Sequence, residues 1–129
     1  MKAEELIVGD YVKYTTPPYI KVASITKKKI GYHIKPNEPR MHYVRLCEVT
    51  PIPLTDEILE KNGFVLKEGG MGMYGVTIAS HYIREDLPFE VFCDGEPFAV
   101  WFKDPVNIKY VHQLQHAMRL CNINKTIEL

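Results

Sequence analysis

The stretch IKVASITKKKIGYHIK, residues 20–35, decides how the first part of this chain folds. From Ile20 to Thr26 successive side chains alternate between two sides, with Ile20, Val22 and Ser24 on one and Lys21, Ala23 and Ile25 on the other, and residues 30–35 form another strand-like segment. A period of two is typical of a strand with one buried face. The three consecutive lysines between the two segments indicate a charged turn. The stretch therefore predicts two strands joined at residues 27–29.

Similar segments flank this pair on both sides. Residues 11–14, YVKY, form a short strand-like segment that follows Gly9-Asp10 and ends at residues 15–18, because the prolines there cannot serve a central ladder. From Met41 to Val49, Tyr43, Arg45 and Cys47 lie opposite the apolar set Val44, Leu46 and Val49. Four or five short strands spaced by about ten residues predict a small antiparallel barrel.

A short helix is predicted after the strands. Thr55 has a side chain that can cap the first turn, and Leu54 and Leu59 occupy the two positions of a hydrophobic staple. Asn62-Gly63 is a natural left-handed stop. At about two turns, this helix depends on packing rather than on intrinsic propensity.

The second part of the chain returns to strands. Residues 64–67 and 74–83 have β-forming composition, and residues 89–93 and 98–102 flank the sequence Asp-Gly-Glu-Pro at 94–97. Asp-Gly readily adopts the positive φ of a tight turn, so the last two segments predict a hairpin.

The final periodic run predicts a helix from Ile108 to Cys121, with Asn107 as its cap and Asn122 at its end. Its apolar positions repeat at helical spacing and should pack on the sheet that contains residues 89–102. These positions are Val111, Leu114, Met118 and Cys121. Residues 126–129 are expected to add a short edge strand.

The predicted fold class is α+β, with an N-terminal SH3-like small antiparallel barrel followed by a helix–sheet–helix lobe. We place the barrel lobe at residues 1–53 and the α+β lobe at residues 54–129, with one integrated domain as the alternative. Charge changes sign near the same boundary. Residues 1–50 carry nine Lys/Arg and five acids, net +4, whereas residues 51–129 have net charge −4. Such asymmetry is typical of a basic lobe with an anionic partner, or of two lobes that attract each other.

Composition favours a cytoplasmic protein without a membrane-spanning segment. No apolar stretch approaches the ~18 residues of a membrane span, and Glu4 and Glu5 stand where a signal peptide would need apolar residues. The three cysteines Cys47, Cys93 and Cys121 contain no Cys-x-x-Cys pair, so we expect reduced, buried thiols.

Residues 70–75, GMGMYG, match the dinucleotide-binding pattern G-x-G-x-x-G, and Asp94 follows about twenty residues later. That motif works by opening a helix whose N-terminus holds a pyrophosphate. Here the β-branched residues 76–78 follow, and Asp94 fits the hairpin turn better. We therefore interpret the segment as a Gly-rich connection and expect no nucleotide cofactor.

His112 and His116 are four residues apart, so one helix face could present both to a metal ion. The glutamate of the H-E-x-x-H metalloprotease motif is absent, because Gln113 follows His112. A metal-dependent enzyme is therefore a weak alternative, and a polar helix edge is the simpler interpretation. No other nucleophile or acid–base arrangement gives any residue a catalytic role, so the sequence leans away from an enzyme and predicts neither metal nor cofactor.

The basic half carries the main candidate surface, in which tyrosines mix with cations. Small barrels with such faces bind single-stranded nucleic acid by stacking and phosphate contacts, and aromatic grooves also bind Pro-rich peptides. The plain alternative is that strands favour tyrosine and lysine. The candidate residues are Tyr14, Lys27, Lys28, Lys29, Tyr32, Arg40, Tyr43 and Arg45.

Three blocks of the chain resemble known proteins. Residues 6–12, LIVGDYV, are similar to the opening L-x-x-G-x-x-V strand of SH3-like barrels. Residues 52–64 and 110–115 resemble a group of small uncharacterised proteins of Bacteroides-type genomes and their phages or mobile elements. Residues 116–121 depart from the aromatic helix end of that group. The resemblance implies a shared origin and a related fold, and it supplies no activity. The sequence thus predicts a non-enzymatic adaptor or accessory protein, with nucleic-acid binding as the first alternative.

Overall fold

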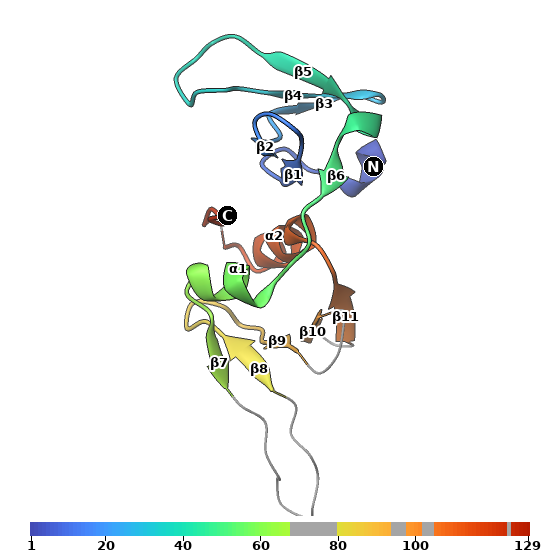
Figure 1. Cartoon of the computed structure of the whole chain (residues 1–129). Helices are drawn as coiled ribbons and strands as arrows, with labels where there is room; N and C mark the ends of the chain where they lie inside the picture. Colours follow the sequence, from blue (N-terminus) through green and yellow to red (C-terminus); the bar gives the residue numbers. More distant parts are fainter. Residues whose placement is uncertain (68–79, 94–97, 102–104, 124) are drawn as a thin grey trace, which may run out of the picture. The chain divides into compact units, whose positions relative to one another are not determined.

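The computed structural model describes residues 1–67, 80–93, 98–101, 105–123 and 125–129. It confirms a mixed α+β fold, and the chain divides into two compact units, Met1–Ile52 and Pro53–Leu129 (Figure 1). In the described part of the chain, no helix is long and apolar enough to cross a membrane.

The first unit contains six short strands and two turns of 3₁₀ helix. Two antiparallel sheets form, with strand orders β2-β1-β6 and β3-β4-β5. The elements are η1 (Ala3–Glu5), β1 (Tyr11–Lys13), β2 (Tyr19–Lys21), β3 (Ser24–Ile25), β4 (Lys29–Tyr32), β5 (His42–Arg45), η2 (Leu46–Glu48) and β6 (Thr50–Pro51).

The closed barrel expected from the sequence is not formed, because the segment expected to be one strand changes sheets between β2 and β3. The N–H of Val22 donates to the Asp10 carbonyl beside β1, whereas the N–H of Ala23 donates to the Gly31 carbonyl in β4. Consecutive residues therefore bond to different sheets, and the two sheets separate at this point.

One hydrophobic core serves both sheets of the first unit. Side chains from β1, β2, β4 and β5 are buried in one cluster, together with residues from the segments around them. The cluster consists of Leu6, Val12, Ile20, Val22, Ile30, Tyr32, Val44, Leu46 and Val49. The predicted alternation around Val44 is confirmed, since the apolar residues there are buried while Tyr43, Arg45 and Cys47 are exposed.

The described residues of the second unit form a five-stranded antiparallel sheet with strand order β11-β10-β9-β8-β7, and two helices. The predicted hairpin strands pair as expected, with Ala99 opposite Phe92 and Val100 opposite Val91. Their turn at 94–97 lies outside the described residues. The elements are α1 (Asp56–Lys61), β7 (Val65–Lys67), β8 (His81–Ile83), β9 (Val91–Phe92), β10 (Phe98–Trp101), β11 (Pro105–Ile108) and α2 (Val111–Leu120).

The capping signals of α1 are confirmed. The Thr55 hydroxyl accepts a hydrogen bond from the Ile58 N–H (3.3 Å). At the other end Gly63 has φ +85°, and the N–H groups of Gly63 and Phe64 donate to Glu60 and Leu59 carbonyls (both 3.1 Å). This pair of bonds is a Schellman motif, which satisfies carbonyls that the helix end leaves unpaired.

The last helix begins three residues later than predicted, at Val111 instead of Ile108. Residues 105–108 pair with β10, so Asn107 lies in a strand and caps no helix. The Gln113 side chain accepts from the N–H groups of Lys109 (2.7 Å) and Tyr110 (3.1 Å), which sets the new start. The apolar stripe is confirmed at its three fully buried positions, Val111, Leu114 and Met118.

No strand is assigned to residues 126–129, where an edge strand was predicted. Instead, the Asn62 side-chain amide accepts from the Glu128 N–H (2.6 Å) and donates to the Glu128 carbonyl (2.7 Å). The Asn62 side chain thus makes the pair of backbone hydrogen bonds that a neighbouring strand would make. We call this pair of bonds the Asn62 clamp, and Ile127, which precedes Glu128, is buried.

Candidate functional site

The structure exposes the predicted basic residues of the first unit but only one of the three predicted tyrosines. Lys27, Lys28, Lys29, Arg40 and Arg45 are exposed. Tyr43 is 61% exposed.

The assignment of Tyr32 to the surface is wrong. Its side chain is only 8% exposed and belongs to the core cluster, and its ring lies 5.7 Å from that of His42. Tyr32 follows Ile30 at an interval of two, so both side chains point to the same face of β4. Tyr14 is half-buried and packs against the same core. The tyrosines therefore do not form one exposed face with the cations.

The three lysines are held by a tight turn between β3 and β4. The backbone N–H of Thr26 donates to the Lys29 carbonyl (2.8 Å). The Thr26 hydroxyl donates to the same carbonyl and accepts from the Lys29 N–H (both 3.1 Å). Threonine thereby closes the turn with both its backbone and its side chain, which leaves Lys27 and Lys28 at the tip.

Further contacts bring this turn beside the end of β5. The Lys28 carbonyl accepts from the Leu46 N–H (2.9 Å), and Lys29 lies directly opposite Arg45 in the register of β4 and β5. Like charges that face each other across strands are unfavourable. The fold therefore tolerates a concentration of positive charge here.

A depression of about 670 Å³ lies at this position. Apolar and thiol groups of Ala3, Leu46 and Cys47 line it together with cationic side chains. Glu4 is the only acid in its lining. We call this feature the basic depression, and its cations are Lys2, Lys27, Lys28, Lys29 and Arg45.

Only one of these cations has a local counter-ion in the described part of the chain. The Arg45 guanidinium donates to Glu48 (3.0 Å), and the Arg45 N–H also donates to that carboxylate (3.3 Å). These hydrogen bonds lower the pKa of Glu48 and raise that of Arg45. Lys2 and the three turn lysines form no ion pair with a described residue. Four lysines are thus available to an anionic partner.

Tyr43 lies on the same strand face as a residue of the basic depression, whereas Arg40 does not line it. Tyr43 is two residues before Arg45 on β5, so their side chains share one face of the sheet. Arg40 lies outside the lining of the basic depression, and its carbonyl accepts from His33 Nδ1 (3.0 Å). The predicted surface is therefore reduced to the turn lysines, Arg45 and Tyr43.

Sequence reasoning missed Lys2 and the apolar lining. Lys2 and Ala3 are far from the lysine turn in the sequence, and no local pattern connects them with it. Cys47 was expected to be buried but is exposed, because it belongs to η2 at the edge of the depression. Cys93 and Cys121 are half-buried, and Cys93 Sγ donates to the Ser80 carbonyl (3.1 Å).

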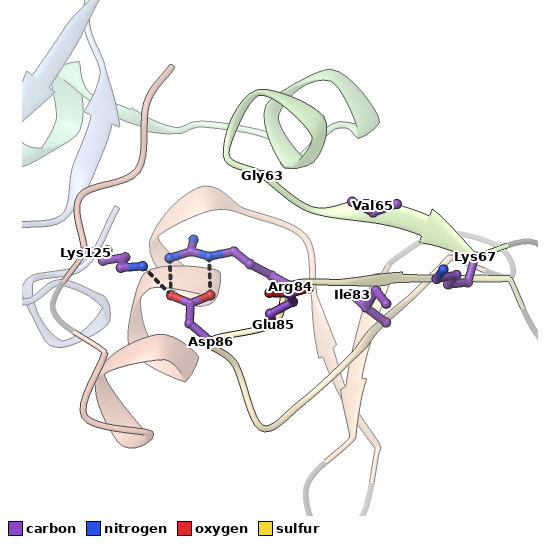
Figure 2. A pocket seen from close by; sticks show the side chains of 8 residues that line it. All are labelled: Gly63, Val65, Lys67, Ile83, Arg84, Glu85, Asp86 and Lys125. Atoms are coloured by element: carbon purple, nitrogen blue, oxygen red, sulfur yellow. Dashed lines mark hydrogen bonds and ion pairs between the residues drawn. The ribbon is translucent and has the colours of Figure 1, made fainter.

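A second depression, of about 480 Å³, lies in the other unit (Figure 2). Figure 2 shows the Asp86 carboxylate between two cations. Arg84 donates through Nε (2.6 Å) and Nη2 (2.7 Å), and Lys125 Nζ is 2.8 Å from the same carboxylate. Both cations hold the pKa of Asp86 well below its usual range. We call Arg84, Asp86 and Lys125 the Asp86 triad.

The two adjacent acids Glu85 and Asp86 differ in their surroundings. Glu85 is exposed, but Asp86 is ion-paired and half-buried. Arg84 also lies over the Phe64 ring, 5.7 Å from its centroid, and reaches the Asn62 carbonyl (3.4 Å). Two cations of this lining, Arg84 and Lys125, are thus paired with Asp86, and through Lys125 the pairing connects the segment after α2 to Asp86.

The histidine pair of α2 lies in a packed setting. His112 is buried, its ring stacks on that of Tyr110 with centroids 5.8 Å apart, and His116 meets it edge-on at 5.6 Å. Among the described residues, no three His, Cys, Asp or Glu side chains are grouped so that they could hold a metal ion. The Gly-rich segment 70–75 and Asp94 lie outside the described residues.

In comparisons with known proteins, no family model matches this chain, and no curated protein or solved structure shows significant similarity to it.

Proposed function

We propose that this protein is a non-enzymatic adaptor or accessory protein that binds an anionic partner at the basic depression. The single observation that carries the proposal is the concentration of five cations around one depression with one lining acid. Four of them are lysines without a described counter-ion, although like charges so close together disfavour the fold. An anionic partner would remove that repulsion.

We further propose that the first unit is an SH3-like module in which two sheets surround one core. Several observations support this. Leu6 and Val12 are both in the core cluster, and Gly9 between them has φ +98°, which favours glycine. The turn at η2 between β5 and β6 and the change of sheet after β2 fit a module of two small sheets. The likeness to small proteins of Bacteroides-type genomes and their mobile elements agrees with an accessory role.

The proposal is tested with immobilised heparin, a sulfated polyanion, as the probe. Three lysines of the turn are replaced together by glutamine (K27Q/K28Q/K29Q). The matched control replaces Lys13, Lys21 and Lys35 (K13Q/K21Q/K35Q), which are exposed in the same unit and lie outside the depression's lining. Both variants lose three positive charges, so net charge alone affects them equally.

We expect the wild type and the control to elute at similar salt concentrations, and the turn variant to elute at clearly lower salt. Equal elution of the two variants would contradict a localised site. Failure of the wild type to bind heparin at low salt would refute the proposed function. Circular dichroism spectra of the three proteins should coincide, because every replaced lysine is exposed.

A further inference from the structure

We propose that the anionic partner is a single-stranded nucleic acid, whose phosphates contact the turn lysines while a base stacks on Tyr43. The inference rests on the proposed function, since it names the class of partner that the basic depression accepts. Besides the cations, this class of partner requires an exposed aromatic ring on which a base can stack. A partner bound by charge alone would not need that ring.

The lysines provide the phosphate contacts. Ammonium groups act as compact point charges toward phosphate. Lys27 and Lys28 stand at the tip of a turn that Thr26 fixes by three hydrogen bonds, so the backbone that carries the charges is already ordered. A preordered site loses less conformational entropy on binding. Arg45, which is paired with Glu48, contributes less.

Tyr43 provides the stacking platform. Its side chain is 61% exposed, although large aromatic residues usually bury most of their surface. It shares the face of β5 with Arg45, which lines the basic depression. Consecutive same-face residues of a strand are separated by about 6.5–7 Å. The ring is therefore within a nucleotide's reach of the cations.

This arrangement favours a single strand over the other anionic partners. In a duplex the bases are stacked on each other, and a tyrosine ring cannot reach their faces without unstacking them. An acidic peptide would satisfy the lysines, but it carries no planar group that requires an exposed tyrosine. The basic depression of about 670 Å³, which Arg45 lines from the face of β5 that also carries Tyr43, gives an unstacked nucleotide a place to enter.

The test measures fluorescence anisotropy of labelled oligothymidylate and oligouridylate with the full chain at low salt. A duplex of the same length and a poly-glutamate peptide of equal charge serve as competitors. The variants are Tyr43→Ala and Tyr43→Phe, the latter as the control that keeps the ring. Both should fold, because the Tyr43 side chain is exposed and lies outside the core cluster.

We expect the wild type to bind at least one single strand better than it binds either competitor. Tyr43→Ala should weaken binding about 5- to 150-fold, the range for loss of one stacked base, while Tyr43→Phe stays close to wild type. The two oligonucleotides differ in the 2′-hydroxyl of the sugar and in the C5-methyl group of the base, and a preference for either one supports the proposal.

Two results would overturn the proposal, and they differ in what else they affect. In the first result the protein binds heparin, but it binds poly-glutamate or the duplex as tightly as single strands, or the Tyr43→Ala variant binds single strands like the wild type. The nucleic-acid proposal then fails, and the anion-binding function stands. If neither heparin nor any oligonucleotide binds, both proposals fail together.

Discussion

Replacing Asn62 by alanine removes the clamp that holds the C-terminal segment of the second unit. The Asn62 side chain makes three hydrogen bonds to backbone groups. It donates to the Ile58 carbonyl (2.7 Å) and to the Glu128 carbonyl (2.7 Å), and it accepts from the Glu128 N–H (2.6 Å). The first bond belongs to the end of α1, whereas the other two attach a segment 66 positions away.

The expected cost of Asn62→Ala follows from these three bonds. Each contributes roughly 0.5–1.5 kcal/mol net, so their loss should lower the free energy of unfolding by about 2–4 kcal/mol. Asn62 is half-buried, so water only partly replaces the lost partners. Asn62→Asp is the matched control of nearly equal size. Its carboxylate still accepts from the Glu128 N–H but cannot donate when ionised. The Ile58 and Glu128 carbonyls therefore both lose their donor, and the free energy of unfolding should fall by a similar amount.

The assay combines urea unfolding, followed by circular dichroism, with amide hydrogen exchange at Ile127 and Glu128. In Asn62→Ala the Glu128 amide should exchange faster than in the wild type, because its acceptor is removed, whereas the carboxylate of Asn62→Asp still accepts from this amide and should keep it protected. A wild-type unfolding midpoint together with unchanged protection of Glu128 in Asn62→Ala would refute the reasoning. It would mean that burial of Ile127 alone holds the segment.

Three further predictions concern the same unit. Leu114→Ala should lower the free energy of unfolding by about 2–5 kcal/mol in a urea melt, because Leu114 is fully buried; a change well below this range would contradict its place in the core. The pKa of Asp86 is lowered in the folded state, so its stabilising contribution is present above its unfolded pKa of about 3.9 and is lost as the pH falls below it. Acid should therefore destabilise the wild type more than Asp86→Asn, and equal acid sensitivity would show that the Asp86 triad adds nothing. Burial, with the hydrogen bond to Asp56, raises the pKa of Tyr82 to about 12, so stability should fall from about pH 10 upward. Tyr82→Phe should remove that alkaline loss, as urea midpoints at successive pH values would show.

Local signals were the part of the fold that the sequence predicted well. Thr55 caps α1 and Asn62-Gly63 ends it, because capping depends on side chains and backbone angles within one turn. Asn122, with φ +59°, ends α2 for the same reason. Such features need no knowledge of distant partners.

Features that depend on remote partners were missed. The change of sheet at Val22 and Ala23 requires acceptors in Asp10 and Gly31, and neither is adjacent in the sequence. The late start of α2 depends on pairing of β11 with β10, which competes with helix formation at residues 105–108. Strand pairing outweighed the helical pattern there.

The candidate site was predicted in part. The lysine turn and Arg45 lie together as the sequence suggested, because β4 and β5 form adjacent strands. The misplacement of Tyr32 was avoidable, since its spacing from Ile30 places both on the core face. Lys2 could not have been found, because only the folded chain brings it beside residues 27–29.

The salt dependence of oligothymidylate binding tests the central claim most directly. Each phosphate contact to a single strand contributes a slope of about −0.7 in log affinity against log salt, so the four lysines without a described counter-ion predict a slope of about −2.8. The variant K27Q/K28Q/K29Q should retain a slope of about −0.7, while the control K13Q/K21Q/K35Q keeps the wild-type value. Equal slopes for wild type and the turn variant would show that the basic depression is not where the nucleic acid binds.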